Sequence, residues 1–115
     1  MMAISDEEMR ESLAKARSYS MVILRKGPRY EDPGARPIIV EHGRRNMALR
    51  KEGILPIVCP TTDQDEVRGI GIFAVSLEEC RSLMESDPGV VAGIFSYELH
   101  PARGFPGSSL PDRDS

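Results

Sequence analysis

Short apolar runs alternate with polar stretches along the chain, and four of these runs are typical of β-strands. Residues 18–26 (SYSMVILRK), 54–60 (ILPIVCP) and 67–75 (VRGIGIFAV) are rich in β-branched and other apolar side chains. A fourth strand is expected within residues 89–100 (GVVAGIFSYELH), where apolar and polar side chains alternate. Proline, glycine and polar residues lie between these runs, so we expect four separate strands.

Three other segments have the spacing and the end signals of helices. Residues 5–17 predict a peripheral helix with acidic residues in its first turn. Residues 38–52 predict a second helix, which ends at Gly53. A third helix is expected to begin after Ser76, whose hydroxyl is a good N-cap, and to run to about Ser86.

The order of the central elements is strand, helix, strand, strand, helix, strand. With short, right-handed connections this order predicts a ferredoxin-like α+β fold, in which both helices cover one face of a four-stranded antiparallel sheet. The other face is then bare, and a bare apolar face on so small a domain predicts a homodimer. We expect a helical extension at 1–17, the ferredoxin-like domain at 18–101 and a Pro/Gly-rich tail at 102–115.

Composition excludes several classes of function. The 115 residues carry a formal net charge of -3 and only 5% aromatic residues, which argues against a nucleic-acid partner. No apolar run approaches the ~18 residues that span a bilayer, and the acidic N-terminus does not resemble a signal peptide. We therefore expect a cytoplasmic protein in which Cys59 and Cys80 are both free thiols, with Cys80 packed in the core.

The predicted topology brings distant polar residues to one end of the sheet. The first strand ends there, the first helix starts there, and the turn between the second and third strands lies there. The second helix also ends there. The candidate residues at this end are Arg25, His42, Cys59, Arg68 and Asp87.

His42 and Asp87 are the candidate catalytic pair, because a carboxylate can orient a histidine and stabilise its charged form. The alternative for His42 is a helix histidine with a satisfied ring, and the alternative for Asp87 is a turn former before proline. A carboxylate just past a helix C-terminus faces the negative end of the helix dipole. That unfavourable position favours a partner for Asp87, and His42 is the candidate.

Arg25, Arg68 and Cys59 are the candidate substrate-binding residues. The two arginines would suit an anionic group, and their alternative is solvated surface. Cys59 would be a nucleophile or a pocket wall, and its alternative is a small apolar residue at a strand end. Gly69 and Gly71 would leave room for a ligand or for a close approach of backbone.

Two segments resemble the YCII-related (YciI-like) family: EHGRRNMALRKEG, and FAVSLEECRSLMESDPGVVAGIFSYELHP. The resemblance covers roughly residues 18–101 and implies a ferredoxin-like subunit that dimerises sheet to sheet as a dimeric α+β barrel. It also implies a His–Asp pair in a pocket, which falls on His42 and Asp87. The chain has Cys59-Pro60 where the family commonly has Gly-Pro, so the shape of the pocket does not carry over.

These observations favour a small-molecule enzyme in which a His–Asp pair transfers a proton. The reaction would be an isomerisation, a lyase reaction or a dehalogenation of a small aromatic or carbonyl compound. The sequence contains no metal, flavin or nucleotide motif, so no cofactor is expected. The alternatives are a non-catalytic ligand-binding or regulatory homodimer that uses the same pocket, and an interaction module without a small-molecule site.

Overall fold

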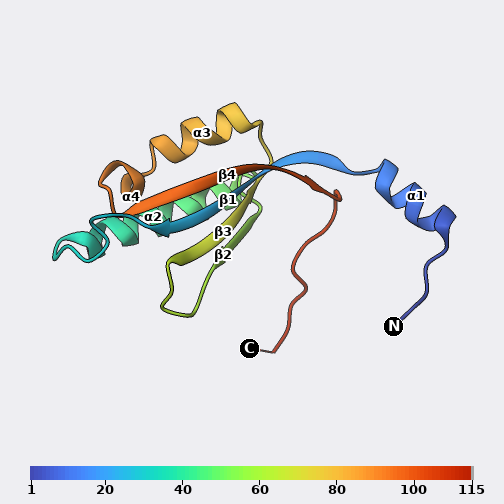
Figure 1. Cartoon of the computed structure of the whole chain (residues 1–115), viewed down its shortest axis with the longest axis horizontal. Coiled ribbons are helices and arrows are strands. Elements are labelled where there is room, and N and C mark those ends of the chain that lie inside the picture. Colours follow the sequence, from blue (N-terminus) through green and yellow to red (C-terminus); the bar gives the residue numbers. More distant parts are fainter. Residues whose placement is uncertain (115) are drawn as a thin grey trace.

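The computed structural model describes residues 1–114 and has the predicted ferredoxin-like α+β fold (Figure 1). The elements in chain order are α1 (Asp6–Ala14), β1 (Arg17–Lys26), α2 (Ala35–Lys51), β2 (Ile57–Pro60), β3 (Val67–Phe73), α3 (Leu77–Glu85), α4 (Pro88–Val91) and β4 (Phe95–Gly104).

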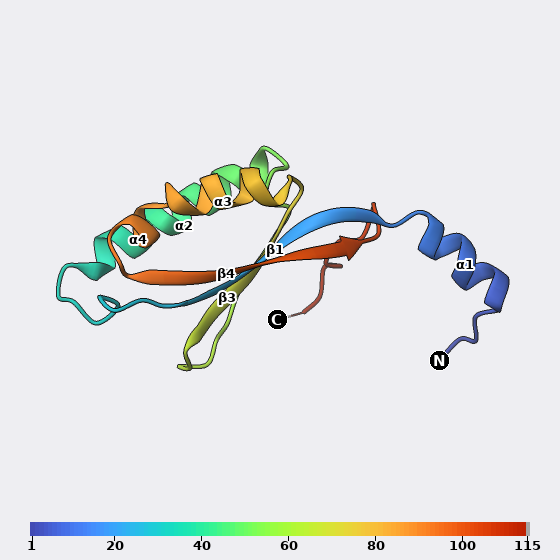
Figure 2. The same ribbon diagram turned by 45° about the horizontal axis from the view of Figure 1, so that its top comes forward.

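The four strands form one antiparallel sheet in the order β2-β3-β1-β4. Helices α2, α3 and α4 all lie on one face of this sheet, and no helix within residues 1–114 covers the opposite face (Figure 2). This arrangement follows from the chain order, because a right-handed crossover returns each helix to the same side of the sheet.

The predicted helix ends agree with the structure in three places. The hydroxyl of Ser5 accepts a hydrogen bond from the Glu8 amide at the start of α1, and that of Ser76 accepts one from the Glu79 amide at the start of α3. Gly53 follows the end of α2 with a φ of 78°, a left-handed conformation that a glycine adopts without strain.

The structure differs from the prediction at several elements. Helix α1 ends at Ala14 rather than at residue 17, and strand β2 begins at Ile57 rather than at residue 54. Helix α2 begins at Ala35, three residues early, because Pro37 is tolerated in a first turn whose amides have no partner within the helix. Residues 88–91 form the short helix α4 rather than leading directly into a strand. Strand β4 continues to Gly104, because residues 101–104 still pair with β1.

The core lies between the helices and the covered face of the sheet. The larger cluster of buried residues is Val22, Leu49, Leu55, Phe73, Cys80 and Met84. The smaller cluster is Ala35, Ile94 and Phe95, at the end where α2 and α4 meet. Cys80 is fully buried in the larger cluster, as expected from its place on the apolar stripe of α3.

The bare face of the sheet is largely apolar. Adjacent strands pair Ile57 with Ile72 and Ile72 with Met21, and the next row pairs Ile70 with Ile23. Ile70 is 41% exposed although it lies in the middle of a strand. Apolar residues side by side on an open sheet face are typical of a surface that another molecule covers.

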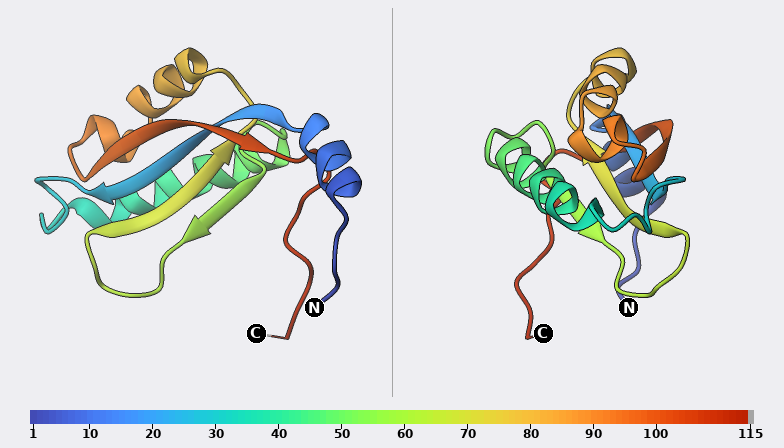
Figure 3. Two further views of the ribbon diagram at one scale, coloured as in Figure 1. Left: turned by 45° about the vertical axis from the view of Figure 1, so that its right-hand side comes forward. Right: turned by 90° about the vertical axis from the view of Figure 1, so that its left-hand side faces the viewer.

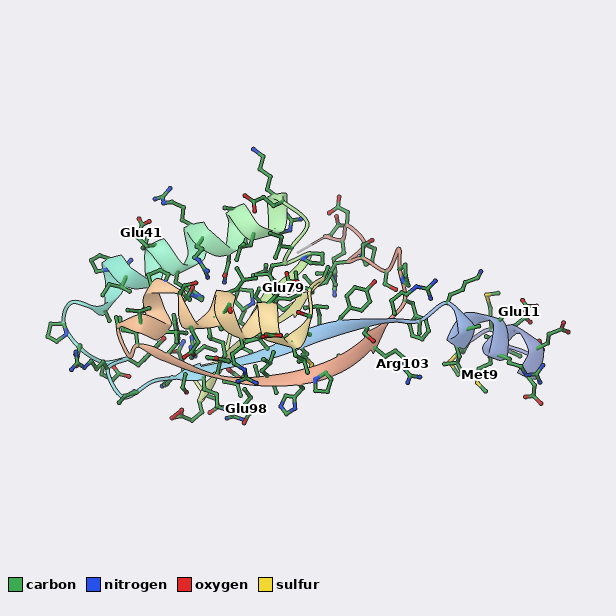
Figure 4. All side chains as sticks on the ribbon, turned by 90° about the horizontal axis from the view of Figure 1, so that it is seen from above. Met9, Glu11, Glu41, Glu79, Glu98 and Arg103 are labelled. Carbon is green, nitrogen blue, oxygen red and sulfur yellow. The ribbon has the colours of Figure 1, made fainter. Side chains whose placement is uncertain are left out.

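Helix α1 stands apart from this body. It projects beyond the end of the sheet, far from α2 and α4, and none of its residues is buried (Figures 1 and 3). The side chains of Met9 and Glu11 extend from it into open space (Figure 4). A helix of nine residues with no packed face gains little stability from the rest of the chain.

Candidate active site

His42 and Asp87 lie in direct contact, as the topology predicted. Nδ1 of His42 is 2.9 Å from each oxygen of the Asp87 carboxylate. His42 projects from the middle of α2, and Asp87 follows the end of α3. The His42 residue is 8% exposed and Asp87 is 1% exposed, so the contact is shielded from solvent.

Asp87 is held in place by the backbone that follows it. It is the N-cap of α4, and its Oδ2 accepts hydrogen bonds from the amides of Gly89 at 3.0 Å and Val90 at 3.2 Å. Asp87 does follow the end of α3, as predicted, but the prediction did not include the second helix that begins at this residue. Asp87 lies at the positive end of α4, where a carboxylate is stabilised.

Arg45 is a further partner of Asp87 that the sequence analysis did not single out. Its Nη1 lies 3.5 Å from Oδ1 of Asp87. Its Nη2 donates to the carbonyl of Leu83 at 2.8 Å and to the hydroxyl of Ser86 at 3.1 Å. Arg45 thus ties α2 to the end of α3 and adds positive charge beside the buried carboxylate. Its spacing of three residues from His42 is the signal that could have identified it.

These contacts determine the charge of Asp87. Burial raises the pKa of this carboxyl, but the hydrogen bond and charge of His42, the Val90 amide and the Arg45 guanidinium lower it more. The net pKa lies below the ordinary value of 3.8. Asp87 is therefore ionised at neutral pH and can only accept hydrogen bonds, so the proton between the two residues belongs to Nδ1 of His42.

The other side of the His42 ring is also in contact with protein. Nδ2 of Asn46 lies 3.2 Å from Nε2 of His42. The ring of Phe95 packs against the imidazole with centroids 4.6 Å apart. Phe95 can lie there because residue 89 is glycine, where a Cβ would be 2.5 Å from the Phe95 ring. The imidazole is thus fixed on both edges and on one face.

A cavity of about 70 Å³ opens beside the His42 ring, between α2 and the covered face of the sheet. Its walls are mostly apolar and include Leu24, Val58 and Phe73, while His42 and Asn46 are among its polar contributors. Asp87 does not line the cavity. Asn46, whose amide contacts Nε2, lines the cavity together with His42, so the Nε2 edge is on the cavity side of the ring.

Gly69 and Gly71 form part of the cavity wall, and both also allow close packing. A Cβ at residue 69 would lie 2.9 Å from the carbonyl oxygen of Cys59, and one at residue 71 would lie 3.0 Å from Cδ1 of Leu55. A side chain at either position would clash with its neighbour. It would also fill part of the cavity beside the His42 ring.

Two of the three predicted substrate-binding residues lie at the cavity. Cys59 and Arg68 both line it. Arg68 is the extra residue of a β-bulge, because Leu24 pairs with Gly69 whereas Arg25 pairs with Val67. Nη1 of Arg68 donates to the carbonyls of Asp63 and Asp65, so that guanidinium is partly engaged by its own turn.

Arg25 lies elsewhere. Leu24 faces the cavity, and the next residue of a strand points to the opposite face. Arg25 accordingly forms an ion pair with Glu98 across the bare face, with its Nε 3.2 Å from Oε1. Glu98 points away from the helices (Figure 4). The interpretation of Arg25 as a contact of a ligand in the cavity has no geometric support.

The described part of the chain offers no evident place for a metal ion. Within residues 1–114, no group of three or more His, Cys, Asp or Glu side chains is arranged to hold one. Among the same residues, no helix combines the length and the apolar composition that crossing a membrane requires.

The arrangement has the parts of an oriented acid/base group. The carboxylate fixes the ring, the proton on Nδ1 is directed to that carboxylate, and the opposite nitrogen faces a mostly apolar cavity. An imidazole held in this way can accept a proton on Nε2 while the carboxylate stabilises the resulting positive charge.

No family model matches this chain, and no curated protein matches it either. Among solved structures, the chain is similar to 5-chloro-2-hydroxyhydroquinone dehydrochlorinase from Burkholderia phenoliruptrix, solved in complex with 2,5-dihydroxybenzoquinone. The two share 23% identity and a TM-score of 0.46, and the match covers 70% of this chain and 90% of the dehydrochlorinase. So distant a match carries no argument about the chemistry of this chain.

Proposed function

We propose that this chain is a small-molecule enzyme in which His42 transfers a proton and Asp87 orients it. The observation that carries the proposal is the double contact of Nδ1 with the Asp87 carboxylate, with the Nε2 edge at a cavity. The proposed substrate is a small aromatic or carbonyl compound. The resemblance of two segments to the YciI-like family supports the same assignment without identifying a reaction.

The proposed chemistry begins with abstraction of an acidic C–H proton by Nε2. The electron pair of that bond moves toward an adjacent carbonyl, which becomes an enolate. Return of the proton to another carbon completes an isomerisation, and loss of a halide or another leaving group from the enolate completes an elimination. In both cases Asp87 stabilises the imidazolium, and a well-placed acid/base group of this kind contributes about 10²–10⁴-fold to the rate.

The size of the cavity limits the substrate. A cavity of about 70 Å³ holds only a few water molecules, and it is about half the volume of a dry cavity of about 150 Å³ that binds benzene. A substrate with an aromatic ring would therefore extend beyond the cavity.

We also propose that a second copy of the chain covers the bare face of the sheet. The exposure of Ile70 in the middle of that apolar face supports this. A second copy seated there would bury Ile70 and the isoleucines beside it.

A non-catalytic ligand-binding homodimer is the second candidate. It is favoured by the hydrogen bond between Asn46 and Nε2, because a base whose lone pair is already occupied is not free to accept a proton. In this case the same cavity would bind a ligand without turnover.

A screen of quinones, lactones and halo-aromatic compounds tests the proposal. The wild-type protein should convert at least one of them, and His42→Ala should lower the rate by about 10²-fold or more. His100→Ala is the matched control, since the other histidine of the chain lies on the opposite face, and it should keep full activity. Equal turnover by the wild type and His42→Ala would remove His42 from the mechanism, and binding without turnover would favour the second candidate.

A further inference from the structure

We propose that Asn46 is a positioning residue for His42. In the free protein its amide donates a hydrogen bond to the Nε2 lone pair, and a bound substrate displaces the amide from that lone pair. This inference rests on the proposed function, because it assigns Nε2 as the atom that accepts the proton. The two residues lie four apart on α2, so they occupy the same face of the helix. Their contact, from Nδ2 to Nε2, is 3.2 Å long.

The hydrogen-bond partners define which nitrogen of His42 carries the proton. The Asp87 carboxylate can only accept, so Nδ1 donates to it. In the neutral ring, Nε2 then has a lone pair and needs a donor. The amide group of Asn46 supplies that donor, and the positive charge of Arg45 is directed at Asp87 instead of at the ring.

An amide suits both protonation states of the ring, which a carboxylate or an apolar side chain does not. While Nε2 is unprotonated, the NH₂ group of Asn46 donates to it. After Nε2 has taken a proton, rotation of the amide presents Oδ1, which accepts from the new N–H. Asn46 therefore supports His42 before and after proton transfer without fixing its charge.

This arrangement also defines what a substrate must offer. A substrate that reaches Nε2 displaces the Asn46 amide and leaves its N–H groups without an acceptor. A carbonyl oxygen next to the acidic C–H would accept one of them and gain negative charge as the proton leaves. The site therefore fits an enolisable carbonyl compound better than a hydrocarbon or an isolated halide.

Nitrogen-15 NMR of the histidine rings tests the positioning role without any substrate. His100→Gln removes the other histidine and leaves one ring to observe. At a pH where the ring is neutral, the spectrum should show Nδ1 protonated and Nε2 unprotonated. A ring protonated on Nε2 alone would overturn the proposal, and this measurement needs no change at Asn46.

Variants of Asn46 extend the test. Asn46→Asp places beside Nε2 a carboxylate, which accepts hydrogen bonds but does not donate them, and should shift the Nε2 resonance strongly at a fixed pH. Met47→Asp adds the same charge to the next, exposed residue of α2 and should shift that resonance much less. Equal shifts in the two variants would show that no specific contact exists.

The substrate requirement is tested by matched compounds in the screen described above. Carbonyl compounds with an acidic α-hydrogen should turn over, and analogues that lack either group should not. Turnover confined to compounds without the carbonyl would contradict the proposed role of the amide. If nothing turns over but the NMR results are as expected, the catalytic proposal fails while the positioning of His42 by Asn46 stands.

Discussion

Nδ1 of His42 lies 2.9 Å from both oxygens of Asp87, although 45 residues separate the two along the chain. Asp87 also caps α4 through the amides of Gly89 and Val90. One carboxylate therefore joins α2 to α4 and completes the proposed site. Loss of this carboxylate should affect both stability and function.

Asp87→Ala should lower the free energy of unfolding by about 3 kcal/mol or more. The change removes a helix cap and leaves the buried His42 and the half-buried Arg45 without this acceptor. Urea denaturation measures the effect. Asp112→Ala, at an exposed position of the tail, is the control and should change stability by less than about 0.5 kcal/mol. Similar values for both variants would mean that the buried contacts add no stability.

The contribution of Asp87 should also depend on pH. Its pKa in the folded protein is lower than 3.8, so the unfolded chain takes up the proton first as the pH falls. The stabilisation is therefore present above pH 3.8 and is lost as the pH falls from there through the folded pKa. The difference in unfolding free energy between wild type and Asp87→Asn should shrink across this acidic range. A difference that grows on acidification would contradict a lowered pKa.

Gly89→Ala should destabilise the protein by roughly 1–3 kcal/mol, because the new methyl group would lie 2.5 Å from the Phe95 ring. Movement of that ring would also disturb the face of His42. Gly43→Ala is the matched control, since it lies within α2 with open space around it. It should stabilise the protein by about 0.5–1 kcal/mol. Thermal unfolding of the two variants measures both effects, and a neutral Gly89→Ala would contradict the tight packing.

The two thiols should differ in reactivity. Burial raises the pKa of Cys80 to about 11, and its side chain is fully covered. Cys59 is partly exposed. Treatment of the folded protein with iodoacetamide should therefore modify Cys59 first, and Cys80 only in denaturant. Peptide mass spectrometry identifies the site, and rapid labelling of Cys80 in the folded protein would show that the core opens readily.

Ile70→Lys should reduce self-association if a second copy covers the bare face. The substitution places a charge in the middle of that apolar face. Val40→Lys, at an exposed position of α2 on the other side of the molecule, is the control and should leave the oligomer intact. Light scattering distinguishes a monomer of 12.7 kDa from a dimer. A monomeric wild-type protein at micromolar concentration would refute the proposed dimer.

Sequence signals were sufficient for the order of the elements and for the meeting of His42 with Asp87. The apolar runs form strands, the two serines cap helices, and Gly53 follows the end of a helix, so these local signals agree with the fold. Chain order and the handedness of crossovers then place the start of α2 and the end of α3 at the same end of the sheet. For this reason a contact between residues 45 apart could be expected without a structure.

The N-cap role of Asp87 and the contacts of Arg25 and Arg45 could not be predicted from local sequence signals. Asp87 precedes proline, which fits a turn, a helix stop and an N-cap equally well, and the sequence does not distinguish them. Arg25 and Leu24 are neighbours on a strand, so only one of them can face the cavity. Arg45 lies three residues from His42 on α2, but the spacing does not say which of the nearby carboxylates its long side chain will reach.

The amides of Gly89 and Val90 donate directly to the carboxylate that orients His42, so their NMR resonances should follow the charge of Asp87. Protonation of Asp87, substitution of His42 or entry of a ligand beside the ring would each change the electron density at Oδ2 and shift these two signals. The chain therefore contains its own backbone reporters of the proposed site. Titration of a compound library against these two resonances would detect ligands of this protein before any reaction is known.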